Sequence, residues 1–186
     1  TSWMPFLKKQ GWNIVKIKAK GGLVSPDELY SSLTPDTKVV AIMAVNNVTG
    51  AIEDTKSLVD CVRRFEKENG KKILFFSDSV QALGKTGLNL KGSDVDGASF
   101  SAHKINGPRG VGLLYAKNPE IIRPIASAGG QEGGHRGGTE NLPGVAAFDE
   151  ALTEWMENRE EDEERIGVYN RILRETLSKL GLEIIS

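Results

Sequence analysis

The chain has 186 residues, with 24 Lys and Arg against 25 Asp and Glu, a single Cys, and 39% hydrophobic residues beside 21 Gly. This is the composition of an ordinary globular protein, and a net charge of −1 argues against a general nucleic-acid binder. No apolar run approaches the roughly 20 residues of a membrane-spanning helix, and a lone cysteine forms no internal disulfide. We therefore expect a cytoplasmic protein with no nucleic-acid or membrane partner.

The first elements expected in chain order are a helix that stops at Gly11, a short strand over residues 14–17, and a helix from Pro26 to about Leu33. Ser25 can cap the second helix, and proline suits a first helical turn. The segment Lys38–Val45 (KVVAIMAV) is nearly continuous in apolar, mostly β-branched residues. Such a run is typical of a strand buried on both faces at the centre of a parallel sheet.

Alternating helical and extended patterns continue along the chain. A helix over Asp54–Asn69 is expected to end at Gly70, and further strands are expected at Ile73–Phe76, Ala98–Ser101 and Val111–Ala116. Strands that alternate with helices predict an α/β fold with a mainly parallel sheet and flanking helices. Its ligand site should lie beyond the carboxyl ends of the strands.

A long helical stretch is expected from Pro143 to Leu180, where Gly167 could divide it into two helices. The acidic run Glu157–Glu164 is typical of a solvated helix face, with a partner-binding surface as the alternative. Leu182–Ile185 could begin another strand.

Polar residues directly follow several of the expected strands. Because parallel strands end at the same edge of a sheet, we expect these side chains to converge on one binding site. They are Asn47, Asp78, Gln81, Ser101, His103 and Lys104.

These residue types match the functional groups of pyridoxal 5'-phosphate (PLP). A partly desolvated Lys104 would have a lowered pKa, and its free amine could form a Schiff base with an aldehyde. Asp78 could face a protonated pyridine nitrogen. Ser101, His103 and the amides of the turn 107–110 could donate to a phosphate.

Simpler interpretations remain open for each piece. Asp78 could be a turn or cap residue, and His103 with Lys104 could be an ordinary surface pair. The glycine-rich stretch 129–139 could be a flexible loop.

Cys61 lies among Leu58, Val62 and Phe65 in an expected helix, where a free cysteine is typically a small buried hydrophobe. We therefore interpret Cys61 as structural and not as a sulfur acceptor. Two His and one Cys at these spacings match no metal-ligand pattern, so no metal is expected. His135 and Arg136 are expected to face the mouth of the active site or a subunit interface.

The segments SDSVQALGK, SFSAHKINGPRGVGLLYA and GGQEGGHRGGTENLPGVAAF resemble the cysteine desulfurases, PLP-dependent enzymes of the class V aminotransferase superfamily. The likeness is clearest over residues 45–148, and it implies the large domain of a fold type I PLP-dependent transferase. It implies that Lys104 forms the Schiff base with PLP and that Asp78 partners the pyridinium nitrogen. Gln81 would donate to the ring hydroxyl oxygen, and Asn47 would lie near that oxygen and the substrate.

The resemblance also implies roles beyond one active site. Ser101 and His103 would hold the phosphate, and Thr139 would reach the phosphate bound by the neighbouring subunit of a homodimer. The implied reaction converts L-cysteine to L-alanine and passes the sulfur to an acceptor cysteine, with a sulfur-acceptor protein in iron–sulfur cluster assembly as a further partner.

The sequence departs from the family pattern at Val48, where an acid is common, and at Glu53-Asp54, where Gln-Pro is common. We expect residues 1–180 to be the central part of the large domain, and 181–186 to begin the connection to a small C-terminal domain. The ring-stacking His would precede Thr1 and the nucleophilic cysteine would follow Ser186. The alternatives are another class V activity, such as transamination or selenocysteine cleavage, and a non-catalytic assembly module that binds a partner through its acidic face.

Overall fold

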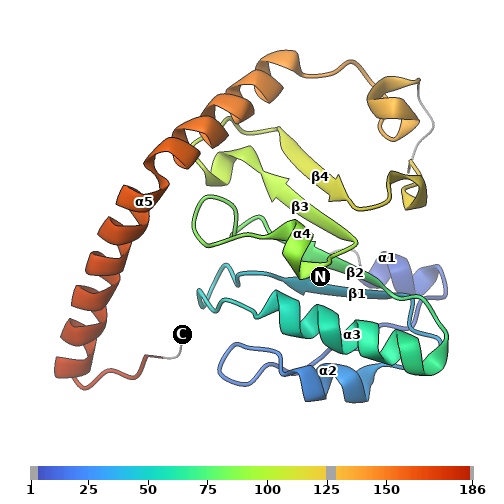
Figure 1. Ribbon diagram of the computed structural model, residues 1–186, viewed down its shortest axis with the longest axis horizontal. Coiled ribbons are helices and arrows are strands. Elements are labelled where there is room, and N and C mark those ends of the chain that lie inside the picture. Colours follow the sequence, from blue (N-terminus) through green and yellow to red (C-terminus); the bar gives the residue numbers. More distant parts are fainter. Residues whose placement is uncertain (1–3, 125–128, 185–186) are drawn as a thin grey trace.

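The computed structural model describes residues 4–124 and 129–184 (Figure 1). Its helices are α1 (Met4–Lys9), α2 (Pro26–Ser32), α3 (Thr55–Asn69), α4 (Leu90–Ser93) and α5 (Leu142–Lys179). Its strands are β1 (Val39–Met43), β2 (Leu74–Asp78), β3 (Gly97–Ser101) and β4 (Gly112–Ala116). Short 3-10 helices lie at η1 (Ala102–Lys104), η2 (Pro119–Ile121) and η3 (Gln131–Gly134).

The strands form one sheet in the order β1-β2-β3-β4. β1, β2 and β3 run parallel, whereas β4 is antiparallel to β3. This confirms the expected α/β class and the mainly parallel sheet. β1 lies at the edge of the described sheet and not at its centre.

The two faces of the sheet differ in how they are covered. α2 and α3 pack together on one face, where their apolar side chains join those of Val40 and Phe75 in the main core (Figure 1). Val39, which faces the other way, is 48% exposed, whereas Val40 is 5% exposed. The prediction that this strand is buried on both faces is therefore wrong for the described residues, because α2 and α3 cover only one of them.

The main core depends on α3, which is capped at both ends. The Asp54 carboxylate accepts a hydrogen bond from the Ser57 amide, and Gly70 ends the helix with a φ of 63°, a conformation that favours glycine. Cys61 lies in this core, where its thiol donates to the Pro26 carbonyl at 3.2 Å and burial raises its pKa. The structural interpretation of Cys61 is confirmed.

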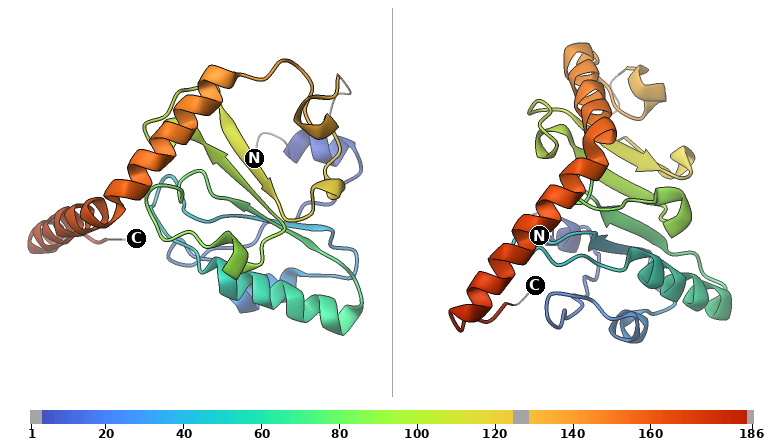
Figure 2. Two further views of the ribbon diagram at one scale, coloured as in Figure 1. Left: turned by 45° about the horizontal axis from the view of Figure 1, so that its top comes forward. Right: turned by 60° about the vertical axis from the view of Figure 1, so that its left-hand side comes forward.

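α5 is a single helix of 38 residues, so the predicted break at Gly167 is wrong. The buried residues of α5, Gly144, Phe148 and Ala151, all lie in its first part, and its C-terminal part extends beyond the sheet in both views of Figure 2. The acidic run 157–164 is exposed apart from half-buried Asp162, which confirms a solvated face. Among the described residues, no helix is long and apolar enough to span a bilayer.

Two other predicted elements are not formed. Residues 14–17 have no regular secondary structure: Ile17 packs against the main core, but Val15 is exposed and no strand of the described residues pairs with this segment. Residues 182–184 are not a strand, and the end of that predicted segment lies outside the described residues.

Candidate functional site

The parallel strands bring three chain segments to one edge of the sheet. Asp78 is the last residue of β2 and is in register with Met43 of β1 and Ser99 of β3. Ser101 ends β3 and leads directly into η1, which carries Lys104. The sequence prediction that these strand ends share one edge is confirmed.

Asp78 and Ser101 also share a face of the sheet. Partners in register point to the same side, and side chains alternate along a strand. Asp78 therefore lies on the side of Ser99, and Ser101, two residues further along, lies there too. This is the face that α2 and α3 leave uncovered.

The Asp78 carboxylate has one oxygen engaged and one available. Oδ1 accepts a hydrogen bond from the Val80 amide at 3.2 Å, so Asp78 does act as a turn residue. Within residues 4–124 and 129–184, Oδ2 has no hydrogen-bond partner, although the residue is half-buried. The turn role thus leaves an oxygen available to a ligand.

Gln81, in the turn after β2, has a partner that sequence reasoning missed. Its Oε1 accepts a hydrogen bond from Lys85 Nζ at 2.7 Å. Desolvation lowers the pKa of Lys85, and repulsion from the Lys104 ammonium lowers it further. The four-residue spacing of Gln81 and Lys85 was the available signal, because side chains so spaced meet on a helical turn.

Ser101 and His103 form a hydrogen bond of 2.8 Å between Oγ and Nδ1. If Nδ1 carries the proton and donates to Oγ, the Ser101 hydroxyl proton is left for another acceptor such as phosphate. The Gly107 amide, one of the predicted phosphate donors, instead donates to the Ala102 carbonyl and closes the turn. That part of the predicted cradle is wrong.

The loop that carries Lys104 is fixed by close packing. Ile105 is buried in a second core with Phe148 of α5. Asn106 follows with a φ of 66°, a left-handed conformation that is costly for most residues but tolerated by Asn. Lys104 itself is half-buried, and its amine makes no hydrogen bond within the described part of the chain.

The other two predicted site residues, Asn47 and Thr139, are exposed. Asn47 is exposed in the turn after β1, which Asn46 caps by accepting from the amides of Val48 and Thr49. The glycine-rich stretch 129–139 contains η3, which lies away from η1, and the chain then runs back to the start of α5 in Figures 1 and 2.

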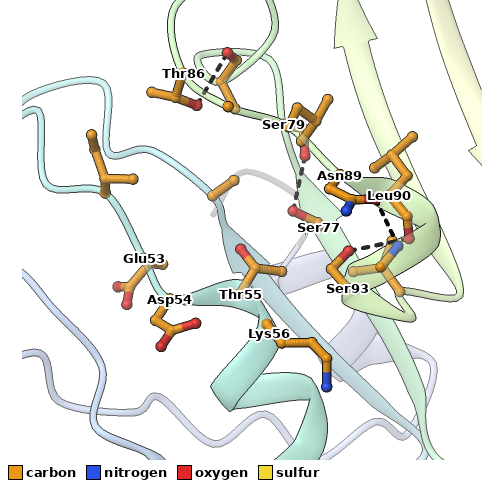
Figure 3. Close-up of a pocket in the computed structure, with 17 residues that line it drawn as sticks. Glu53, Asp54, Thr55, Lys56, Ser77, Ser79, Thr86, Asn89, Leu90 and Ser93 are labelled. Carbon is orange, nitrogen blue, oxygen red and sulfur yellow. Dashed lines mark hydrogen bonds between the residues drawn. The ribbon is translucent and has the colours of Figure 1, made fainter.

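A cavity of about 330 Å³ lies on the opposite face of the same sheet edge (Figure 3). Ser77 and Ser79, which alternate with Asp78, line it and are hydrogen-bonded to each other at 2.9 Å. Glu53 also lines it; both its carboxylate oxygens accept from the Val24 amide at 3.1 Å, and burial raises its pKa. This cavity does not contain the predicted PLP residues.

The predicted set fits PLP in its chemistry. An available carboxylate oxygen suits a pyridinium nitrogen, an amide suits a phenolic oxygen, a hydroxyl and an imidazole suit a phosphate, and an amine suits an aldehyde. In the described part of the chain, no group of three or more His, Cys, Asp or Glu side chains is placed to hold a metal ion.

Comparisons with known proteins agree with this fit. Residues 1–182 match the class-V aminotransferase family. Cysteine desulfurase IscS of Clostridium botulinum is 35% identical over 171 residues, which are 91% of this chain and 42% of that protein.

Solved structures show the same likeness. A NifS-like protein superposes with a TM-score of 0.90 at 35% identity, over 100% of this chain and 50% of that one. SspA in complex with cysteine superposes with a TM-score of 0.75 at 28% identity, over 82% of this chain and 43% of that one. The chain thus spans about half the length of these relatives, and it belongs to the class-V aminotransferase family.

Proposed function

We propose that the chain supplies the lysine and most of the cofactor contacts of a PLP-dependent cysteine desulfurase. One observation carries the proposal: the available oxygen of Asp78 lies on the same face and edge of the sheet as Ser101, just before the turn that holds Lys104. A carboxylate and an amine so placed suit the two ends of a pyridine aldehyde.

Each side chain has a distinct role in this proposal. Asp78 keeps a proton on the pyridine nitrogen by pairing with its charge, and Gln81 donates to the ring hydroxyl oxygen. Ser101 and His103 bind the phosphate. PLP, when bound, supplies an electron sink for the charge that develops on the substrate α-carbon.

Lys104 has two tasks. It would hold the cofactor covalently through Nζ and, as a free amine, would move the proton at the substrate α-carbon. Lys104 is half-buried, and the buried Ile105 beside it anchors its loop to the second core.

The proposed substrate is L-cysteine, which leaves as L-alanine while its sulfur passes to an acceptor cysteine. Support comes from the IscS relative, named a cysteine desulfurase, and from the SspA structure, which contains cysteine. Cys61 is buried and its thiol pKa is raised, so the acceptor belongs to another part of the full-length protein.

A homodimer, a cytosolic location and a domain division after residue 180 are further parts of this proposal. The exposed side chain of Thr139 in its own chain is compatible with a contact to the neighbouring subunit's site.

Borohydride reduction tests the proposal. Full-length protein is incubated with PLP, reduced, digested and analysed by mass spectrometry. We expect one pyridoxyl adduct, on Lys104, that disappears in Lys104→Ala and persists in Cys61→Ala. Folded protein that carries no adduct, or carries it on another lysine, contradicts the proposal. Release of alanine from L-cysteine then tests the substrate.

A further inference from the structure

We propose that Lys85 is a positioning residue that fixes which end of the Gln81 amide faces the cofactor. The inference rests on the proposed function, because it assigns a role to Lys85 at the same PLP site. Two contacts support the role of Lys85: its own hydrogen bond with Gln81, and the packing of the neighbouring Gly84 against Ile105, the residue after Lys104.

The donor chemistry of Lys85 determines the orientation of the amide. An ammonium group has only donors, so the Gln81 atom that it contacts at 2.7 Å must be the carbonyl oxygen. The amide nitrogen Nε2 therefore points away from Lys85. Without this contact, the amide could turn over and present its oxygen to the ligand instead, because its two ends have nearly the same shape.

The polarity of the amide matters because of what it would face. A phenolic oxygen that has lost its proton is only an acceptor, so it is bound by Nε2 and repelled by Oε1. An amide free to turn over would spend part of its time in the repulsive orientation. Lys85 removes that state before the cofactor binds, which is a gain by preorganisation.

Close packing holds the backbone next to Lys85 against the loop that carries Lys104. Gly84, with a φ of 75°, lies so near Ile105 that an added Cβ would be 2.2 Å from the Ile105 Cγ2 atom. This contact joins the turn of Gln81 and Lys85 to the loop of Lys104. Repulsion from the Lys104 ammonium contributes to the lowered pKa of Lys85, which agrees with their proximity.

The test compares the PLP dissociation constants of full-length variants, measured by titration of the cofactor absorbance. We expect Lys85→Met, which keeps the stem but has no donor, to bind PLP about three- to tenfold more weakly. Lys85→Arg, which keeps a donor, should recover most of this loss. The matched control is Lys71→Met, an exposed lysine before the start of β2, at the opposite edge of the sheet, and it should bind as the parent protein does.

A double-variant cycle separates positioning from a structural effect. If Lys85 acts through Gln81, Lys85→Met should have no further effect on PLP binding once Gln81→Leu is present. Equal loss in both backgrounds would overturn the inference, as would unchanged binding by Lys85→Met.

The proposed function has its own readout in the same experiment. A parent protein that forms the Lys104 adduct while Lys85→Met binds PLP equally well overturns only the role of Lys85. A folded parent protein that forms no adduct overturns both proposals.

Discussion

The Asp78 side chain combines a backbone contact with an available charge, and a single substitution separates the two. Asp78→Asn keeps an oxygen for the Val80 amide but loses the charge that would pair with a pyridinium. We expect PLP binding to weaken by about 1–3 kcal/mol, with the fold unchanged, since a charge-assisted hydrogen bond becomes a neutral one. Cofactor titration measures the loss, and Asp36→Asn, in an exposed turn, is the control. Equal affinity for PLP would count against the pyridinium assignment.

The effect of the Glu53 charge on folding stability can be tested through its pH dependence. Burial raises its pKa above the ordinary value of 4.5, so the folded state prefers the neutral carboxyl. Its contribution to stability is therefore present below that ordinary pKa and is lost as pH rises through the folded-state pKa. Glu53→Gln should be more stable than the parent protein near neutral pH, by less than about 1 kcal/mol because the carboxyl is only partly buried.

Urea unfolding at several pH values measures the difference in unfolding free energy between Glu53→Gln and the parent protein. This difference should shrink as the pH falls below the ordinary pKa of a glutamate. Asp54 is the opposite case: its hydrogen bond with the Ser57 hydroxyl is the main cause of the lowered pKa of the Asp54 carboxyl, so Asp54→Asn should be less stable than the parent protein near neutral pH. The Asp54 contribution to stability is present above its ordinary pKa and is lost as pH falls. A Glu53→Gln variant that is less stable than the parent protein near neutral pH would contradict the sign.

Individual site residues could be predicted to different degrees. Asp78, Ser101 and Lys104 follow expected strands, and parallel pairing was enough to bring their segments together. The contact of Gln81 with Lys85 depends on the shape of a turn, and the use of the Gly107 amide depends on how its loop closes. Neither can be deduced from residue order alone.

At the scale of elements, the turn after β2 and the loop after β3 depend on one glycine. Gly84 and Gly50 both have a φ of 75°, but an added Cβ meets Ile105 at Gly84 and nothing within 4 Å at Gly50. Gly84→Ala and Gly50→Ala should therefore both lose about 1–2 kcal/mol of stability, because alanine is disfavoured in the left-handed conformation. Gly84→Ala should lose about 1–3 kcal/mol more, as overpacked sites do.

Urea unfolding of the two variants isolates the contact. Gly84→Ala should also weaken PLP binding, because the displaced Ile105 is next to Lys104, whereas Gly50→Ala should weaken it less. Equal losses of stability in the two variants would show that the turn and the loop are not tightly packed.

The helices differed in how well the sequence predicted them. α3 was predicted within a residue because an acidic cap, an apolar face and a terminal glycine all agree. Gly167 misled because an exposed glycine costs a helix only about 1 kcal/mol, and long runs of helix-forming neighbours outweigh that. A single breaking residue is therefore a weak signal in a long helix.

For the whole molecule, the fold class followed from the alternation of apolar strands and amphipathic helices, but the covering of the sheet did not. The apolar run Lys38–Val45 predicts a strand buried on both faces, but one face of β1 is open in the described residues. A sequence pattern records that a residue is apolar, not whether another segment covers it. For this reason the sequence did not predict that one face of the sheet is open or that the far part of α5 extends beyond the sheet.

The far part of α5 gives a prediction for the chain as a body in solution. Ile166, Tyr169 and Leu173 recur at helical spacing there, Leu180 continues the spacing just after the helix, and they are 53%, 63%, 57% and 69% exposed. An exposed apolar stripe of this kind favours association. We expect the isolated chain of 186 residues to self-associate in a concentration-dependent way, as measured by sedimentation velocity.

Replacing Tyr169 and Leu173 by Lys in one variant should reduce this association without loss of helix content, because both side chains are exposed and lysine is a good helix former. Glu160→Lys, also on α5, changes the net charge by the same amount and leaves the stripe intact, so it should associate as the parent chain does. If the two variants behave alike, charge and not the stripe controls association. If the stripe controls association, the apolar face of α5 is the surface through which two copies of this chain contact each other.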